Sequence, residues 1–169
     1  QVIRLLGDLL VRYSDSSENF VGHVGGDDFV VIFRHPQWRD ICEQILSQFD
    51  EQVRSFYTPR DLQQGGIWAS DRKGEPTFFP MLGLAIGVVH PDPYKCTSHH
   101  EVAELAAMAK KEAKKLPGSA LFVSRRRKVG YPVDGEVPEE RRNDRPEEED
   151  AVLQIKPDIE AEFHPEQLN

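Results

Sequence analysis

Residues 20–34, which read FVGHVGGDDFVVIFR, constrain the fold of this chain more than any other stretch. Two short apolar runs flank the pair Gly25 and Gly26. A glycine pair between β-prone segments is a strong signal for a β-hairpin, because glycine adopts positive φ angles without a steric penalty. The sequence therefore predicts two antiparallel strands joined by a tight turn.

Two acidic residues, Asp27 and Asp28, directly follow the glycines and precede the second apolar run. Adjacent side chains of a strand point to opposite faces, so one carboxylate could bind a metal ion while the other meets a second ligand or a backbone group. The two charges repel each other unless a cation or hydrogen-bond donors offset them. The alternative is an ordinary hairpin whose acidic residues serve only solubility.

Apolar spacing predicts the other elements of the chain. Helical spacing favours helices over residues 1–13, 37–57 and 99–116, the last with a lysine-rich outer face. Strands are predicted over residues 65–69, 78–89 and 120–123. This order of elements predicts an α/β (α+β) domain with a mostly antiparallel central sheet packed by helices.

The run MLGLAIGVV at residues 81–89 is apolar on both faces. Such a run predicts a central strand that is buried on both sides. Gly83 and Gly87 would let neighbouring elements approach this strand closely.

The charge distribution divides the chain into two parts. Residues 1–128 hold 17 Lys and Arg against 16 Asp and Glu, whereas residues 129–169 hold 4 against 13. The first part is predicted to be one domain, and the second an acidic, disordered tail. Within the tail, residues 151–163 are expected to form a helix or strand only against a partner. Cutting the chain after Lys128 is therefore expected to leave the fold intact.

Composition argues against several classes of protein. A near-neutral body argues against a nucleic-acid surface, which would show a basic face. Cys42 and Cys96 lack the spacing of a disulfide framework or a zinc site, so a reduced, cytoplasmic setting is the default. No apolar run approaches the ~18 residues that a membrane span requires. Gln1 opens directly into a predicted helix, so an upstream part of the domain could be missing.

The pentapeptide Gly25-Gly26-Asp27-Asp28-Phe29, between apolar strand halves, resembles the GGDEF motif of the diguanylate cyclases. Residues 79–89 and 109–114 also resemble a later strand and the phosphate-side helix of that family. The order of predicted elements over residues 1–125 is similar to the GGDEF fold from its second helix onward. The resemblance therefore implies an N-terminally incomplete GGDEF domain over residues 1–128, with a nucleotide-cyclase-like sheet.

The resemblance implies a role in bacterial second-messenger signalling. In that family, two GTP-loaded domains meet face to face, and each 3′-hydroxyl attacks the α-phosphate of the other GTP to give cyclic di-GMP. Two Mg²⁺ ions activate the hydroxyl and neutralise the triphosphate. The implied partners are GTP, a second GGDEF domain in a homodimer, and an upstream sensory or phosphodiesterase domain.

The resemblance also implies roles for individual residues. Asp27 would be the metal ligand and would help to activate the hydroxyl, and Asp28 would be a supporting carboxylate near the ribose and the metal. Gly25 and Gly26 would leave room for the nucleotide and present backbone N–H groups to it. Lys114 matches the triphosphate lysine of the family. The alternative for Lys114 is a solvated position, because the same helix also carries Lys110, Lys111 and Lys115.

The sequence departs from the family pattern at several positions. Asp28 stands where the family usually has the longer Glu, and residues 117–119 (PGS) replace a segment that carries an arginine. His23 stands where an arginine is common, and the Arg-x-x-Asp feedback motif is missing. The first strand and helix of the family, with a further metal carboxylate and the guanine-reading residues, would precede Gln1.

These departures keep two other interpretations open. One is a catalytically inactive GGDEF module that binds GTP and regulates an adjoining domain, such as a cyclic di-GMP phosphodiesterase. The other is a dimerisation module without a nucleotide, which leaves the acidic pair unexplained.

Overall fold

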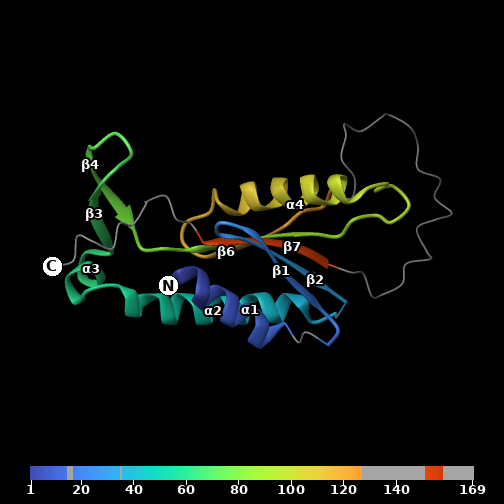
Figure 1. Cartoon of the computed structure of the whole chain (residues 1–169), viewed down its shortest axis with the longest axis horizontal. Coiled ribbons are helices and arrows are strands. Elements are labelled where there is room, and N and C mark those ends of the chain that lie inside the picture. Colours follow the sequence, from blue (N-terminus) through green and yellow to red (C-terminus); the bar gives the residue numbers. More distant parts are fainter. Residues whose placement is uncertain (15–16, 35, 127–150, 158–169) are drawn as a thin grey trace.

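A five-stranded sheet with the strand order β1-β2-β7-β5-β6 forms the frame of the structure (Figure 1). The structure is a computed structural model that describes residues 1–14, 17–34, 36–126 and 151–157. The elements in chain order are α1 (Val2–Tyr13), β1 (Phe20–Gly25), β2 (Asp28–Phe33), α2 (Trp38–Val53), the 3-10 turn η1 (Arg54–Phe56), α3 (Pro59–Gln64), β3 (Gly66–Ser70), β4 (Pro76–Pro80), β5 (Leu84–Val89), α4 (His99–Ala113), β6 (Ala120–Val123) and β7 (Ala151–Pro157).

The sheet is mostly antiparallel, as predicted. β2 pairs with β1 and with β7, and β7 pairs with β5, all in antiparallel register. Among the described strands, only β5 and β6 run parallel, and α4 connects them. β3 and β4 form a separate two-stranded ribbon, which lies at one end of the molecule beside α3 (Figure 1).

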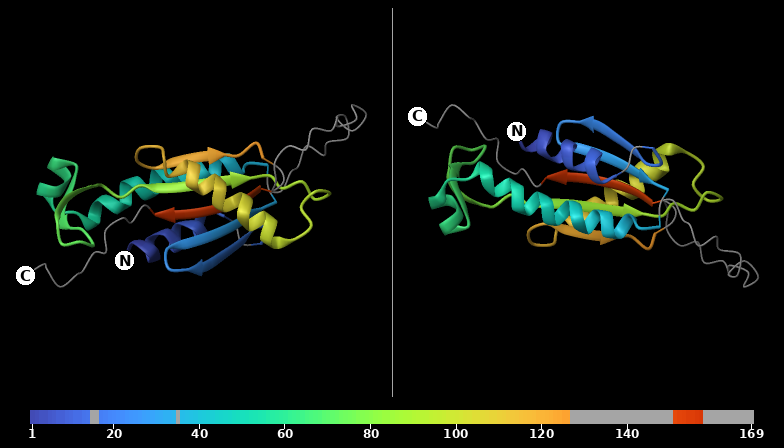
Figure 2. Two further views of the ribbon diagram at one scale, coloured as in Figure 1. Left: turned by 90° about the horizontal axis from the view of Figure 1, so that it is seen from above. Right: turned by 90° about the horizontal axis from the view of Figure 1, so that it is seen from below.

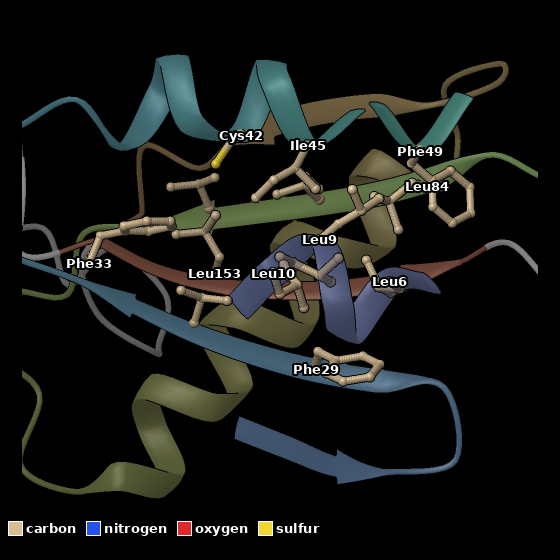
Figure 3. Packing of buried hydrophobic residues seen from close by; sticks show 14 of the residues in the cluster. Leu6, Leu9, Leu10, Phe29, Phe33, Cys42, Ile45, Phe49, Leu84 and Leu153 are labelled. Carbon is tan, nitrogen blue, oxygen red and sulfur yellow. The ribbon is translucent and has the colours of Figure 1, made fainter. Parts of the chain in front are cut away.

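Helices cover both faces of the sheet (Figures 1 and 2). α1 and α2 pack on one face, where alternate residues of β2, β5 and β7 meet apolar side chains of the two helices (Figure 3). α4 packs on the other face through a smaller cluster that includes Leu105, Ala106 and Ala109. The main cluster contains Leu6, Leu9, Leu10, Phe29, Val31, Phe33, Cys42, Ile45, Phe49, Val53, Leu84, Ile86, Val88, Leu153 and Ile155.

The predicted disorder of residues 129–169 is wrong for Ala151–Pro157. This segment is β7, the middle strand of the sheet. Ile155 pairs with Phe29 of β2 on one side and with Ile86 of β5 on the other, and the side chains of Leu153 and Ile155 are fully buried. The partner that this segment needs is therefore the sheet of its own chain. The rest of the predicted tail, residues 129–150 and 158–169, lies outside the described residues.

The predicted strand over residues 78–89 is interrupted. Its first part belongs to β4 and its last part to β5, and the two strands lie in different sheets. Between them, the N–H of Leu82 donates to the hydroxyl of Tyr57 at 2.8 Å, and the N–H of Met81 donates to the carbonyl of Gly65 at 3.2 Å. At Met81 and Leu82, these bonds to other segments take the place of pairing with a strand of the five-stranded sheet. β5 itself is buried at every position, as predicted.

None of the helices among the described residues has the length and apolar character needed to span a bilayer.

Asn19 fixes the entry into the hairpin. Its side chain is buried, and Nδ2 donates to the carbonyl of Ser14 at 3.0 Å while Oδ1 accepts from the N–H of Arg34 at 3.0 Å. One amide thus connects the end of α1 to the end of β2. This connection holds the two strands of the hairpin against the first helix.

We expect Asn19→Ala to lower the free energy of unfolding by about 1–3 kcal/mol, because it leaves the carbonyl of Ser14 and the N–H of Arg34 without their side-chain partner. Urea unfolding of the full chain, followed by circular dichroism, measures the change. Glu18→Ala at the exposed neighbouring position is the control and should change the stability by less than about 0.5 kcal/mol. Equal losses for the two variants would contradict this role of Asn19.

Candidate functional site

The candidate site begins at the turn between β1 and β2. Gly25 and Gly26 both have positive φ angles, 140° and 58°, so the predicted requirement for glycine at the turn is confirmed. A Cβ atom added to either residue would meet no heavy atom within 4 Å. The two residues are therefore needed for their backbone conformation, and the space beside them is open.

His23 stabilises the same turn. Its Nε2–H donates to the carbonyl of Gly26 at 2.9 Å, since a carbonyl oxygen can only accept. The imidazole also stacks on the ring of Phe29, its cross-strand neighbour, with the ring centroids 4.5 Å apart and the planes 19° from parallel. The side chain of His23 thus holds the turn closed.

The two acidic residues lie on different elements. Asp27 lies in the turn, and Asp28 is the first residue of β2; both are half-buried. Phe29 faces the core beneath α1 and α2, so the alternation of the strand places Asp28 on the face that carries α4. Both carboxylates were expected on one strand, pointing to opposite faces; only Asp28 belongs to β2, because the turn extends through Asp27.

Asp28 forms an ion pair with Lys110 of α4. The distance from Lys110 Nζ to Asp28 Oδ1 is 2.8 Å, and the side chains are only 15% and 29% exposed, respectively. The two residues are 82 positions apart in the sequence. Charged pairs that are partly withdrawn from solvent are screened less by salt than exposed pairs are, so this contact ties the hairpin to α4.

A close approach of α4 to β5 brings Lys110 to this position. A Cβ atom on Gly87 would lie 2.2 Å from the backbone N of Lys110 and 2.6 Å from the carbonyl carbon of Ala109. Only glycine leaves room for the helix backbone at this distance. The predicted role of Gly87 is therefore confirmed, and the same is true of Gly83, whose Cβ would lie 2.6 Å from the carbonyl carbon of Gly118.

Lys114, which the resemblance selects, is exposed and forms the C-cap of α4. Its N–H donates to the carbonyl of Lys110 at 3.0 Å, one helical turn earlier. Lys110 reaches the hairpin through its contact with Asp28, whereas Lys114 lies just beyond the last helical residue, Ala113. The structure thus adds Lys110 to the site residues predicted from the sequence.

The helical spacing of α4 distinguishes Lys110 from the exposed lysine that follows it. This residue follows the buried Ala106 by four positions and precedes the buried Ala113 by three, which places it at the edge of the buried face. Lys111 is exposed, and the residues three and four positions before and after it are exposed as well. The spacing therefore separates Lys110 from Lys111, although composition alone does not.

The side chains near the turn can be compared with the ligands that two Mg²⁺ ions would require. Mg²⁺ takes oxygen ligands, and carboxylates are its usual protein ligands. Asp28 offers a carboxylate, but that carboxylate is already neutralised by Lys110. Over residues 1–14, 17–34, 36–126 and 151–157, no three His, Cys, Asp or Glu side chains are grouped so that they could hold a metal ion. While the ion pair persists, these residues do not fit two Mg²⁺ ions, and the metal role of Asp27 stays a prediction.

The candidate site thus comprises the β1–β2 turn and the C-terminal half of α4. The turn and the start of β2 contribute the glycine pair and two carboxylates, and α4 contributes Lys110, which contacts Asp28. No protein-family model matches this chain, and neither a curated protein nor a solved structure matches it.

Proposed function

We propose that residues 1–128 of this chain belong to a GGDEF domain of the diguanylate cyclase type. In the complete protein, a domain of this type would bind GTP at the β1–β2 turn and, together with a second copy, convert two GTP molecules to cyclic di-GMP. The proposal includes a cytoplasmic role in bacterial second-messenger signalling. Asp27 and Asp28 are the proposed catalytic residues, and Gly25, Gly26 and Lys114 are the proposed nucleotide contacts.

One observation carries most of this proposal. The two segments that resemble the family most specifically, residues 25–29 and 109–114, are far apart in sequence and meet through the ion pair of Asp28 with Lys110. Open space beside Gly25 and Gly26 is compatible with a ligand at the turn. Lys110 lies beside the turn, and Lys114 follows four residues later at the end of α4, so these side chains could offer positive charge to a triphosphate. These features support binding of a nucleotide more directly than they support its conversion.

A second candidate function follows from the same ion pair. A catalytically inactive GGDEF module could bind GTP and regulate an adjoining domain, such as a cyclic di-GMP phosphodiesterase. Pairing of Asp28 with Lys110 favours this candidate, because it removes a carboxylate from the set that could bind metal. The shorter side chain of Asp28 and the missing arginine at residues 117–119 favour it as well.

We expect the complete protein to form cyclic di-GMP from GTP in buffer that contains Mg²⁺, and Asp27→Asn to lower the rate by about a hundredfold or more. The expected size follows from the loss of a group that helps to activate the attacking hydroxyl. Product formation is measured by liquid chromatography, and GTP binding by isothermal titration calorimetry. Asp8→Asn, at an exposed position of α1, removes the same charge and should leave the rate unchanged.

The outcomes separate the candidates. Product that is lost in Asp27→Asn and kept in Asp8→Asn supports the cyclase. GTP binding without product, with affinity weakened by a substitution at the turn, supports the regulatory module. Absence of both product and binding would contradict the two candidates together.

A further inference from the structure

We propose that Lys110 is the resident counter-ion of Asp28 and that it keeps a divalent cation from binding to this carboxylate. The inference rests on the proposed function, because that function is what brings a divalent cation to the β1–β2 turn. The inference also goes beyond the proposed function, since it assigns to Lys110 a role in controlling which cation lies beside Asp28.

The geometry of the pair supports this role. At 2.8 Å, Lys110 Nζ occupies one of the positions beside Asp28 Oδ1 that a metal ion bound to that oxygen could take. A doubly charged ion that approaches Asp28 meets a carboxylate whose charge is already offset, and it is also repelled by the ammonium group. Neighbouring charges of this kind change the binding of ions strongly when solvent is partly excluded.

Lys110 also has little freedom to move away from Asp28. Ala109 and Ala113 beside it are buried, and the helix backbone at Lys110 lies against Gly87 without room for a methyl group. Only the flexible side chain could move, and 85% of its surface is already covered, since 15% is exposed. The packing of α4 on β5 therefore holds the ammonium group of Lys110 beside Asp28.

The same helix offers a matched comparison. Lys111 is exposed and adjacent in sequence, but it lies off the side of α4 that faces the hairpin. Methionine has nearly the length of lysine and carries no charge. Lys110→Met and Lys111→Met change the net charge of the chain equally, so any difference between them reports on the position of the charge.

We expect Lys110→Met to bind Mn²⁺ about tenfold more tightly than the wild-type chain does, because the substitution removes a positive charge that repels the metal ion and offsets the carboxylate. The experiment titrates Mn²⁺ alone into the full 169-residue chain and follows free Mn²⁺ by electron paramagnetic resonance. Lys111→Met should bind as the wild type does, and Lys110→Arg, which keeps the charge, should restore weak binding. The double variant Asp28→Asn with Lys110→Met should lose the gain.

Equal Mn²⁺ affinities for Lys110→Met and Lys111→Met would overturn the inference, and so would a gain that survives Asp28→Asn. Thermal melts of all variants identify any that do not fold, and Lys110→Gln, which also removes the charge, replaces Lys110→Met if that variant is among them. Because the titration contains no nucleotide, its result is independent of GTP binding. If the wild-type chain binds GTP but Lys110→Met gains no Mn²⁺ affinity, the inference alone is overturned. If Lys110→Met gains Mn²⁺ affinity but the wild-type chain does not bind GTP, the proposed function alone is overturned.

Discussion

Truncation of the chain after Lys128 is expected to abolish cooperative folding. The cut removes β7, the strand that joins the β1–β2 hairpin to β5 and β6. Burial of the Leu153 and Ile155 side chains alone contributes about 1.5–3 kcal/mol each, compared with a total stability of about 5–15 kcal/mol for a typical domain. Loss of the hydrogen-bond ladders on both sides of β7 adds to this. A thermal melt followed by circular dichroism should show no sharp transition.

Two further variants test the same expectation. A chain that ends at Pro157 keeps every described strand and should melt cooperatively. Leu153→Ala in the full chain should cost about 2–5 kcal/mol, the usual range for a fully buried leucine. A truncated chain that melts at the temperature of the full chain would show that β7 is not required.

Gly87→Ala is expected to destabilise the full chain by about 1–3 kcal/mol or more. The new methyl group would lie 2.2 Å from the backbone N of Lys110, and a backbone atom cannot move aside by a rotamer change. α4 must therefore shift away from β5, which would also separate Lys110 from Asp28. Urea unfolding measures the loss of stability.

Gly7→Ala provides the matched control for this substitution. Its Cβ would lie 3.7 Å from Cε1 of Phe29, which is ordinary van der Waals contact. Because Gly7 lies inside α1, alanine should stabilise the chain by up to about 1 kcal/mol. Similar losses for the two variants would contradict the close approach of α4 to Gly87.

Local patterns predicted most of the fold. The glycine pair predicted the turn of the hairpin, and apolar spacing predicted α1, α2, α4 and β6 to within a few residues. These elements are specified by neighbours in the sequence: the backbone freedom of glycine, the helical stripe, and the alternation of a strand. Their positions required no knowledge of distant contacts.

β7 could not be predicted in the same way. Its seven residues follow the acidic run at 147–150 and prolines, a composition typical of disorder. The strand is stable only because two edges, from β2 and β5, are available on both sides of it. Pairing with such distant strands cannot be predicted from the sequence of the segment itself. The break at residues 81–83 has a similar origin, since Tyr57 and Gly65 supply the competing hydrogen bonds.

The candidate site shows the same division. Turn chemistry and the resemblance identified Gly25, Gly26, Asp27 and Asp28 from the sequence. The lysine that contacts Asp28 was one of several on the same helix, and its selection depends on how α4 packs on β5. Tertiary packing, and not residue type, distinguishes Lys110 from its neighbours.

The position of β7 in the chain has a consequence for biosynthesis. The middle of the sheet is supplied by the last described element, so the hairpin and β5 emerge from the ribosome long before the strand that unites them. Until then, two strand edges and the apolar face beneath them are open to other chains. Nascent polypeptides that stall before residue 151 should therefore depend on chaperones and aggregate more readily than the finished protein.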